Sequence, residues 1–192
     1  ARDGEAIAHG RIYVAPPDHH MLLEHGKVRV VQGPKENGFR PAVDPLFRSA
    51  AYAHGPRVIA VVLSGALDDG TAGLWLVKRR GGLAVVQDPR DAAVPSMPES
   101  ALRAVAVDKV APAAELAQVL ADLSRTPVPA EEDSMARPRT HDDTLTELEL
   151  LIAAGDTTLG TRLFEQAELT PYSCPECHGV LACTGWPSPR RS

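Results

Sequence analysis

The stretch that most constrains the fold is residues 58–74, where a short apolar segment stops at a turn of small residues. Residues 58–63 are all apolar and mostly β-branched, with no polar alternation. This pattern predicts a strand covered on both faces, as in a parallel sheet with helices on each side. In such sheets the functional crevice lies beyond the carboxyl ends of the strands. We therefore look for chemistry within residues 64–69, which include Asp68 and Asp69.

Strands and helices alternate around this stretch, which predicts an α/β domain. A helix over residues 71–80 and a second buried strand at 83–87 complete a βαβ unit, which crosses over right-handed. His25-Gly26 separates two strand-like runs and predicts an antiparallel hairpin at the edge of the sheet. The other expected elements are a strand at 10–15, the hairpin strands at 21–24 and 27–31, helices at 44–54, 96–105 and 112–123, and an edge strand at 107–110.

Several polar residues stand where helices are expected to begin. Asp44, followed by a proline, predicts an N-cap of its own helix, and Ser96 with Glu99 predicts a capping box. The simplest interpretation of Asp68 and Asp69 is likewise that one caps the helix at 71–80 and the other favours its positive end. The alternative is that one of them is the orienting acid of a Ser-His-Asp system.

The composition excludes several classes of protein. The chain has 192 residues, 44% of them hydrophobic and 23% charged, which is typical of a soluble globular protein. No stretch approaches the roughly 20 apolar residues of a membrane helix, and the first residues do not resemble a signal peptide, so a cytoplasmic location is expected. The net charge is −5 and no basic patch is present, so nucleic acid is not an expected partner.

The C-terminal third has a different character. Prolines and a run of acidic residues predict a flexible linker over residues 124–141. Residues 142–154 predict an amphipathic helix in need of a partner surface, and a second short helix is expected at 159–166. The predicted organisation is a sheet domain at 1–123, the linker, and a helical tail at 142–192 that contains all the cysteines.

Cys174, Cys177 and Cys183 lie close together in this tail. The first two form a Cys-x-x-Cys pair, whose spacing lets two thiolates bind one tetrahedral zinc ion. Only Cys183 and His178 remain to complete such a site, and His178 directly follows Cys177. Zinc bound within one chain, zinc shared between two chains and plain reduced cysteines all stay open.

Four ordered motifs carry a resemblance to a known family. They are Gly-Arg-Ile-Tyr-Val-Ala-Pro-Pro-Asp-His-His-Met at 10–21, Arg-Pro-Ala-Val-Asp-Pro-Leu-Phe-Arg-Ser-Ala at 40–50, Leu-Ser-Gly-Ala-Leu-Asp-Asp-Gly-Thr-Ala-Gly-Leu at 63–74, and Met97-Pro98 before a helix. Residues 1 to about 123 thereby resemble the catalytic domain of the chemotaxis protein-glutamate methylesterases. The resemblance implies a doubly wound, mostly parallel Rossmann-like sheet. It also implies a carboxylic ester hydrolase that demethylates receptor glutamates, or deamidates glutamines, by a Ser-His-Asp triad with no cofactor.

The resemblance also assigns roles to individual residues. Asp69 is the triad acid by its position in the motif, and the backbone of Ala66 falls where the family places an oxyanion-hole donor. The family usually has Met at the position of Ala66 and Gly at that of Leu67. His20 matches a regular family position and is a candidate for substrate contact, with an exposed turn histidine as the plainer alternative. For Arg40, an ion pair between loops is expected rather than catalysis.

The family's nucleophile and base have no counterpart in the printed sequence. The resemblance places the serine in a Gly-x-Ser-x-Gly-Gly turn and the histidine after a later strand, both ahead of the motif at 10–16, and the chain contains no such turn. We therefore expect the C-terminal part of a catalytic domain, with its first strands missing and inactive alone. A triad rebuilt from Ser64, His20 and Asp69 is disfavoured, because a hydroxyl at a strand end usually bonds local backbone.

The partners expected from the resemblance are the cytoplasmic domain of a methylated chemoreceptor and, in many relatives, a phosphorylatable receiver domain. Two further functions stay open. One is a non-catalytic signalling module in which the half-domain and the helix at 142–154 bind another chain. The other is an adaptor that binds zinc through Cys174, Cys177 and Cys183.

Overall fold

The computed structural model describes residues 1–128, 141–155, 168–173 and 180–183. The chain divides into two compact units, Ala1–Gly155 and Asp156–Ser192. In the second unit, strand β6 (Glu168–Ser173) pairs antiparallel with β7 (Val180–Cys183). The short helix predicted at 159–166 lies outside the described residues.

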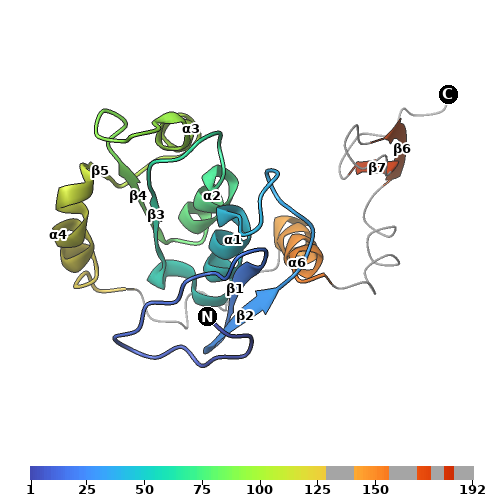
Figure 1. Ribbon diagram of the computed structural model, residues 1–192, viewed down its shortest axis with the longest axis horizontal. Helices are drawn as coiled ribbons and strands as arrows, with labels where there is room; N and C mark the ends of the chain where they lie inside the picture. Colours follow the sequence, from blue (N-terminus) through green and yellow to red (C-terminus); the bar gives the residue numbers. More distant parts are fainter. Residues whose placement is uncertain (129–140, 156–167, 174–179, 184–192) are drawn as a thin grey trace. The chain divides into compact units, whose positions relative to one another are not determined.

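The centre of the first unit is a parallel sheet in the order β3-β4-β5 (Figure 1). Its strands are β3 (Ile59–Val62), β4 (Leu83–Gln87) and β5 (Lys109–Ala111). Both neighbouring pairs are parallel, as the uninterrupted apolar runs predict. The predicted βαβ unit is confirmed, since helix α2 (Thr71–Arg79) connects β3 to β4.

Alternate residues of these strands face two different cores. Ala60, Val62, Ala84 and Val86 point to the side covered by α1 (Val43–His54), α2 and α3 (Ser96–Ala104). Val85, with Ile59 and Val61, faces α4 (Ala113–Leu123), which packs Leu116 against it. Figure 1 shows α4 on one side of the sheet and the other three helices on the opposite side. The protein is therefore an α/β fold with both faces of the sheet covered.

The predicted hairpin is present, but its place differs from the prediction. β1 (His20–Glu24) and β2 (Lys27–Val31) form a separate two-stranded sheet, which is not the edge of the central one. The N-terminal residues run beside β2, where Glu5 O accepts a hydrogen bond of 2.8 Å from Val28 N. Ser49 of α1 accepts a hydrogen bond from Leu23 N at 3.0 Å, which ties the hairpin to that helix.

The strand predicted at residues 10–15 does not form, which corrects the sequence interpretation. Ile12 is 93% exposed and Val14 is 69% exposed. A strand needs a neighbour for its backbone hydrogen bonds, and none of the described strands pairs with this segment. Within the described residues, β3 likewise pairs only with β4, so its other edge is open.

The predicted amphipathic helix is present as α6 (His141–Ala153), and it packs within the first unit. Ala153 is fully buried in a small cluster with Leu22 and Val31 of the hairpin. The backbone of Gly33 lies so close that a Cβ there would sit 1.9 Å from Ala153 O. The surface that covers this helix is thus supplied by the same chain. None of the helices in the described ranges is long and apolar enough to cross a membrane.

Candidate active site

The turn after β3 is fixed to the neighbouring strand and helix. Ser64 N donates to Gln87 Oε1 of β4 at 2.8 Å, and Val94 N donates to Ser64 Oγ at 2.9 Å. Gly65 O accepts a hydrogen bond from Met97 N at 3.0 Å at the start of α3. The turn is therefore held at the carboxyl end of the sheet, where such folds place their sites.

Asp69 ends this turn with a buried side chain, 8% exposed. Its Oδ2 accepts a hydrogen bond of 2.8 Å from Val43 N, and its Oδ1 accepts one of 3.2 Å from Asp44 N. These are the first two amides of α1, so the carboxylate sits on the positive end of that helix. Backbone donors of this kind fix the orientation of the carboxylate.

Asp44 makes the reciprocal contact with the other helix. Its Oδ1 accepts a hydrogen bond of 2.7 Å from Gly73 N in the first turn of α2. Asp69, which precedes α2, thus binds the N-terminus of α1, and Asp44, which belongs to α1, binds the N-terminus of α2. The side-chain amide of Asn37 joins the two, because its Nδ2 lies 2.9 Å from Asp44 Oδ2 and 2.9 Å from Asp69 Oδ1.

This arrangement corrects the capping predictions. The N-cap of α1 is Ala42, not Asp44, and that of α2 is Gly70, with no side-chain cap from Asp68 or Asp69. In α3 the N-cap is Pro95 without a side-chain bond, so the predicted capping box is also absent. The hydroxyl of Ser96 instead donates to Gly65 O at 3.2 Å. The amides are satisfied by acceptors from elsewhere in the chain, which local sequence spacing does not reveal.

Ala66 and Leu67 form the exposed crest of the turn. Within the described part of the chain no acceptor pairs with Ala66 N–H. Leu67 has a φ of 67°, in the left-handed region that favours glycine. The departure from the family's glycine therefore leaves the left-handed turn intact but places a branched side chain in it. The role of Ala66 as an oxyanion donor remains a prediction.

His20 does not have the environment expected of a substrate contact or of an exposed turn histidine. Its side chain is fully buried, with Nε2 2.8 Å from Pro34 O and Nδ1 3.3 Å from Ala42 N. Because Nδ1 faces a donor and Nε2 faces an acceptor, these partners assign the proton to Nε2. The ring ties the loop at 34 to the start of α1. His19 is exposed as expected, with Nδ1 3.0 Å from Pro17 O.

The structure does not bring Ser64, His20 and Asp69 together as a triad. The Ser64 hydroxyl is engaged with Val94, and both His20 nitrogens face backbone groups. The hydrogen bonds of Asp69 are to α1 and Asn37, and none is to His20 or Ser64. The low expectation for a rebuilt triad agrees with these contacts.

Arg40 forms the predicted ion pair between loops. Its Nη2 lies 2.8 Å from Asp18 Oδ1, and its Nη1 donates to Gly33 O. Hydrogen bonds from Arg40 and then from Gln32 lower the pKa of the Asp18 carboxyl below its ordinary value. Arg40 thus fixes the loop that carries Asn37.

A second charged cluster lies behind this loop and was not found from the sequence. Arg48 of α1, 8% exposed, pairs with Glu36, and its Nε lies 3.4 Å from Glu149 Oε2 of α6. Burial raises the pKa of Glu149, an effect that Arg48 opposes and that the charges of Glu36 and Asp44 increase. The Tyr52 hydroxyl also donates to Glu147, so α6 meets α1 through polar side chains, whereas Ala153 packs against the hairpin.

The described ranges contain no group of three or more His, Cys, Asp or Glu side chains that could hold a metal ion. Cys174 and Cys177 lie outside those ranges, and the side chain of Cys183 in β7 is likewise not described. The zinc prediction for the tail therefore stays a prediction.

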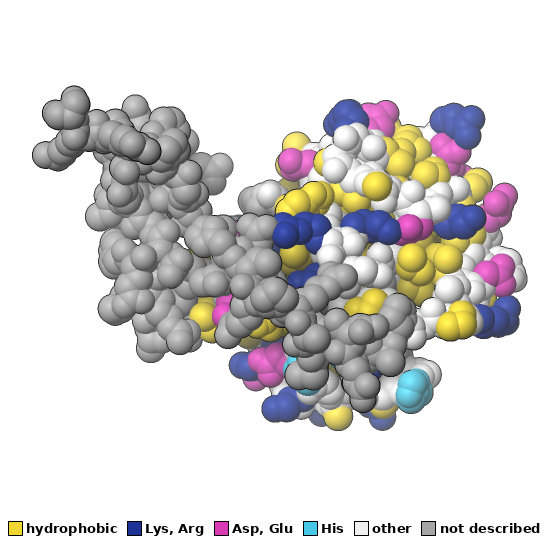
Figure 2. All heavy atoms as spheres, turned by 180° about the vertical axis from the view of Figure 1, so that it is seen from behind, with side chains coloured by type: hydrophobic (Ala, Val, Ile, Leu, Met, Phe, Trp, Pro, Cys, Tyr) yellow, Lys and Arg dark blue, Asp and Glu magenta, His cyan; other side chains and the backbone are white. Residues whose placement is uncertain are grey.

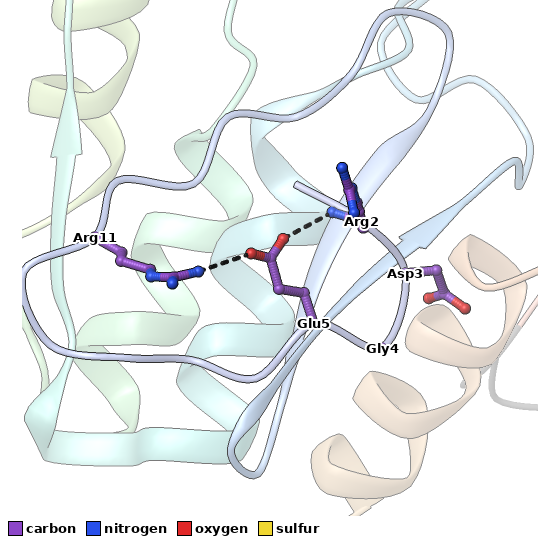
Figure 3. A pocket seen from close by; sticks show the side chains of 5 residues that line it. All are labelled: Arg2, Asp3, Gly4, Glu5 and Arg11. Atoms are coloured by element: carbon purple, nitrogen blue, oxygen red, sulfur yellow. Dashed lines mark hydrogen bonds and ion pairs between the residues drawn. The ribbon is translucent and has the colours of Figure 1, made fainter.

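A pocket of about 530 Å³ lies at the N-terminus (Figure 3), and Asp69 is not part of its lining. The lining residues are Arg2, Asp3, Gly4, Glu5 and Arg11. Glu5 points between Arg11 and the backbone of Arg2, at 3.3 Å and 3.0 Å. Asp3 points to the other side, where it binds Arg29 at 2.8 Å. Its carboxylates are already paired, so this pocket offers no evident chemistry.

A family model described as CheB methylesterase matches residues 1–120. The chain is 43% identical over 121 residues to protein-glutamate methylesterase/protein-glutamine glutaminase 1 of Paramagnetospirillum magneticum, covering 61% of this chain and 32% of that one. It is 39% identical over 125 residues to protein-glutamate methylesterase/protein-glutamine glutaminase 2 of Anaeromyxobacter dehalogenans, covering 65% and 37%.

The solved CheB methylesterase catalytic domain of Thermotoga maritima has the same fold, with a TM-score of 0.61 and 36% identity over 64% of this chain and 67% of that one. The chain spans 65% of a 40% identical relative from Leptospira interrogans and about a third of the longer relatives. The matched part contains the central sheet, Asp69 and the loop of Asn37. This chain belongs to the CheB methylesterase family.

Proposed function

We propose that this chain supplies the acid-bearing part of a protein-glutamate methylesterase and protein-glutamine glutaminase, with Asp69 as the acid of a Ser-His-Asp triad. The observation that carries the proposal is the setting of Asp69. It is buried at the carboxyl end of the sheet, and donors from α1 and Asn37 fix its carboxylate. Membership of the family supports the choice of chemistry.

An orienting acid must keep an oxygen lone pair for the histidine. Asp69 Oδ2 accepts one hydrogen bond, from Val43 N, whereas a carboxylate oxygen has sites for about two. Oδ2 is therefore the oxygen proposed to receive the histidine Nδ1–H, which holds the ring in the tautomer that can take a proton at Nε2. The carboxylate also stabilises the imidazolium that forms.

The reaction proposed for the assembled site has two halves. The serine oxygen attacks the ester carbonyl of a glutamate methyl ester while the histidine takes the serine proton. The histidine returns that proton to the leaving methoxide, so methanol departs and an acyl-serine remains. Water then attacks the acyl-serine in the same way, releasing the glutamate carboxylate and restoring the serine. For a glutamine the first leaving group is ammonia.

The backbone N–H of Ala66 is the proposed donor to the oxyanion of both tetrahedral intermediates. Its support is that this N–H has no acceptor among the described residues and lies on the exposed crest of the turn that also carries Asp69. Removing one such donor in a serine protease costs about 10²–10³ in kcat, so the expected contribution is large. A side-chain change from Met to Ala does not remove it.

The serine and the histidine are proposed to come from a segment other than these 192 residues, which contain no Gly-x-Ser-x-Gly-Gly turn. The edge of β3 that pairs with none of the described strands supports this, and so do the exposed apolar side chains of Ile12 and Val14, because further strands could cover such features. The proposed substrate is the cytoplasmic domain of a methylated chemoreceptor, and the proposed location is the cytoplasm. A receiver domain is a further proposed partner.

The direct test joins the full 192-residue chain to the preceding segment of an active family member that carries the serine turn and the histidine. The chimera is expected to hydrolyse a glutamate methyl ester, and Asp69→Asn in it is expected to reduce kcat by about 10⁴, as loss of the orienting acid does elsewhere. The 192-residue chain alone is expected to show background hydrolysis. Activity of the chimera that is unaffected by Asp69→Asn would exclude Asp69 as the acid.

A simpler check is the reading frame ahead of the Ala1 codon. We expect it to encode a Gly-x-Ser-x-Gly-Gly turn followed by a histidine. A stop codon shortly upstream would instead favour a non-catalytic signalling module. The open edge of β3 favours that second candidate as well, since it can pair with another chain. A purified chain that stays monomeric and binds nothing in pull-downs would contradict the module.

The zinc-binding adaptor remains a prediction for the tail, where Cys174 and Cys177 lie outside the described residues. Elemental analysis of the purified chain tests it. Absence of bound zinc in a preparation made without chelators would exclude this function.

A further inference from the structure

Asn37 sits in a turn built to aim its side chain. Glu36 N donates to Phe39 O at 3.1 Å and Phe39 N donates to Glu36 O at 2.9 Å, so the four residues close a tight two-residue loop. Both central residues have positive φ, 52° for Asn37 and 81° for Gly38, as in a type I′ turn. Asn-Gly is the favoured pair for this turn. The sequence carries this signal, although it was not used to predict the site.

The two flanks of the turn are anchored independently. On one side Glu36 pairs with the buried Arg48 of α1. On the other side Arg40 binds Asp18 and Gly33. The loop therefore has little freedom to move Asn37 relative to α1.

The side-chain NH₂ group of Asn37 has one N–H donor for each of the two carboxylates. Both Asp44 Oδ2 and Asp69 Oδ1 are acceptors, so the atom between them must be the NH₂ group, which has two N–H donors and can give one to each. Both aspartates are buried, at 5% and 8% exposure, while Asn37 is exposed. The amide thus separates two buried like charges from each other and from solvent.

We propose that Asn37 is a positioning residue for Asp69, through an amide that bridges Asp69 and Asp44 and fixes the orientation of the acid. This inference rests on the proposed function of Asp69. Without the bridge, Asp69 Oδ1 keeps only the 3.2 Å contact to Asp44 N, so the carboxylate rotates more freely about its Cβ–Cγ bond. Rotation misplaces the lone pair of Oδ2 that the histidine needs.

Two substitutions test the role without disturbing the turn. Asn37→Gly removes the amide but tolerates the positive φ. Asn37→Asp keeps the shape and also tolerates this region, but replaces the donor with a third acceptor. The matched control is Lys35→Gly, which adds a glycine to the same loop at an exposed position with no contact to either carboxylate.

In the chimera, Asn37→Gly is expected to lower kcat about tenfold with KM within twofold, the effect of losing one hydrogen bond to a charged group. Asn37→Asp is expected to lower kcat further, while Lys35→Gly leaves it unchanged. In the 192-residue chain itself, NMR is expected to show faster exchange of the Val43 and Asp44 amides in Asn37→Gly than in Lys35→Gly. If Asn37 only stabilises the loop, the two glycine variants are expected to lose equal thermal stability. They would then show the same kcat and the same exchange of the Val43 and Asp44 amides.

The outcomes separate this inference from the function on which it rests. If Asp69→Asn leaves kcat intact, the proposed function is wrong. If Asp69→Asn abolishes activity but Asn37→Gly behaves as Lys35→Gly does, Asn37 is not a positioning residue. If Asn37→Gly does not fold, the same comparison of kcat and amide exchange is made with Asn37→Asp.

Discussion

At the scale of single residues, aspartates bind helix N-termini that are remote in sequence. Asp69 holds the first amides of α1, Asp44 holds Gly73 of α2, and Asp91 Oδ2 accepts a hydrogen bond of 2.8 Å from Ala113 N, the first residue of α4. None of these helices uses a side chain of its own N-cap residue. A carboxylate in this position gains from both the free N–H groups and the helix dipole, so it fastens two segments together.

The contact of Asp91 predicts a dependence on pH. Its hydrogen bond from Ala113 N, and then that from Gln87, lower the pKa of the Asp91 carboxyl below its ordinary value. A carboxyl whose pKa is lower in the folded state stabilises the fold above its unfolded pKa of about 3.9. That stabilisation is lost as the pH falls through the folded-state pKa. The difference in urea midpoint between wild type and Asp91→Asn is therefore expected to shrink or reverse from pH 5 to pH 3. A constant difference over that range would contradict the assignment.

Leu67 predicts a stabilising substitution. Its φ of 67° costs a non-glycine residue roughly 1–2 kcal/mol, and glycine pays about 0.5–1 kcal/mol in chain entropy. Since the side chain is 57% exposed, Leu67→Gly is expected to raise the free energy of unfolding by about 0.5 kcal/mol, measured by urea denaturation. Leu63→Gly, also at an exposed leucine but without a positive φ, is expected to lower it.

At the scale of elements, the contact of α1 with α2 positions the site. Gly73 makes close approach of the two helices possible: a Cβ there would lie 2.6 Å from Phe47 Cβ and 3.1 Å from Asp44 O. The short distance between the helices is what lets Asp44 reach Gly73 N. Helix α6 adds a polar contact on another part of α1 through Arg48 and Glu149.

Substitution of Gly73 separates helix propensity from packing. Propensity alone would make Gly73→Ala stabilising by about 1 kcal/mol. The Cβ contact of 2.6 Å is with the backbone-proximal part of Phe47, which cannot rotate away, so we expect a net loss of about 1–3 kcal/mol instead. The exposed neighbour provides the matched test, since Ala72→Gly is expected to cost about 1 kcal/mol by propensity alone. A stabilised Gly73→Ala would show that the helices can move apart.

At the scale of the whole molecule, two features are left without a partner among the described residues. One edge of β3 pairs with no strand, and the apolar segment at 10–15 belongs to no sheet. Figure 2 shows that apolar side chains also reach the surface among charged ones on the face it displays. Ile12 and Val14 are exposed, and one edge of β3 pairs with none of the described strands; both features suit pairing with further strands.

These two features predict self-association of the isolated chain. Sedimentation velocity is expected to show larger species as concentration rises, because the open edge can pair with that of another copy. The variant with Ile12→Lys and Val14→Lys is expected to shift the distribution toward the monomer. Arg11→Lys, which leaves the apolar side chains in place, serves as the control. A wild-type chain that stays monomeric at all concentrations would show that the edge is protected.

The sequence by itself determined the type and order of most elements, because periodicity and apolar runs are local properties. The uninterrupted run at 58–63 predicted a buried parallel strand, and the helix at 71–80 and the strand at 83–87 followed from the same reasoning. The order of the motifs indicated the family, which the family model confirms. The motif at 63–74 predicts Asp69 as the acid of the site. A site defined by its place after a buried strand is within reach of such arguments.

Only the tertiary structure decided which groups those residues contact. Local spacing predicts that Asp44, Ser96 and one of Asp68 and Asp69 cap the helix that each begins or precedes. An orphan helix amide instead takes whichever acceptor the fold brings within reach. The segment at 10–15 has the pattern of a strand, yet pairing depends on a neighbour rather than on the segment itself. Burial of His20 depends likewise on segments far from it in sequence, because the groups that face its ring belong to the loop at 34 and the start of α1.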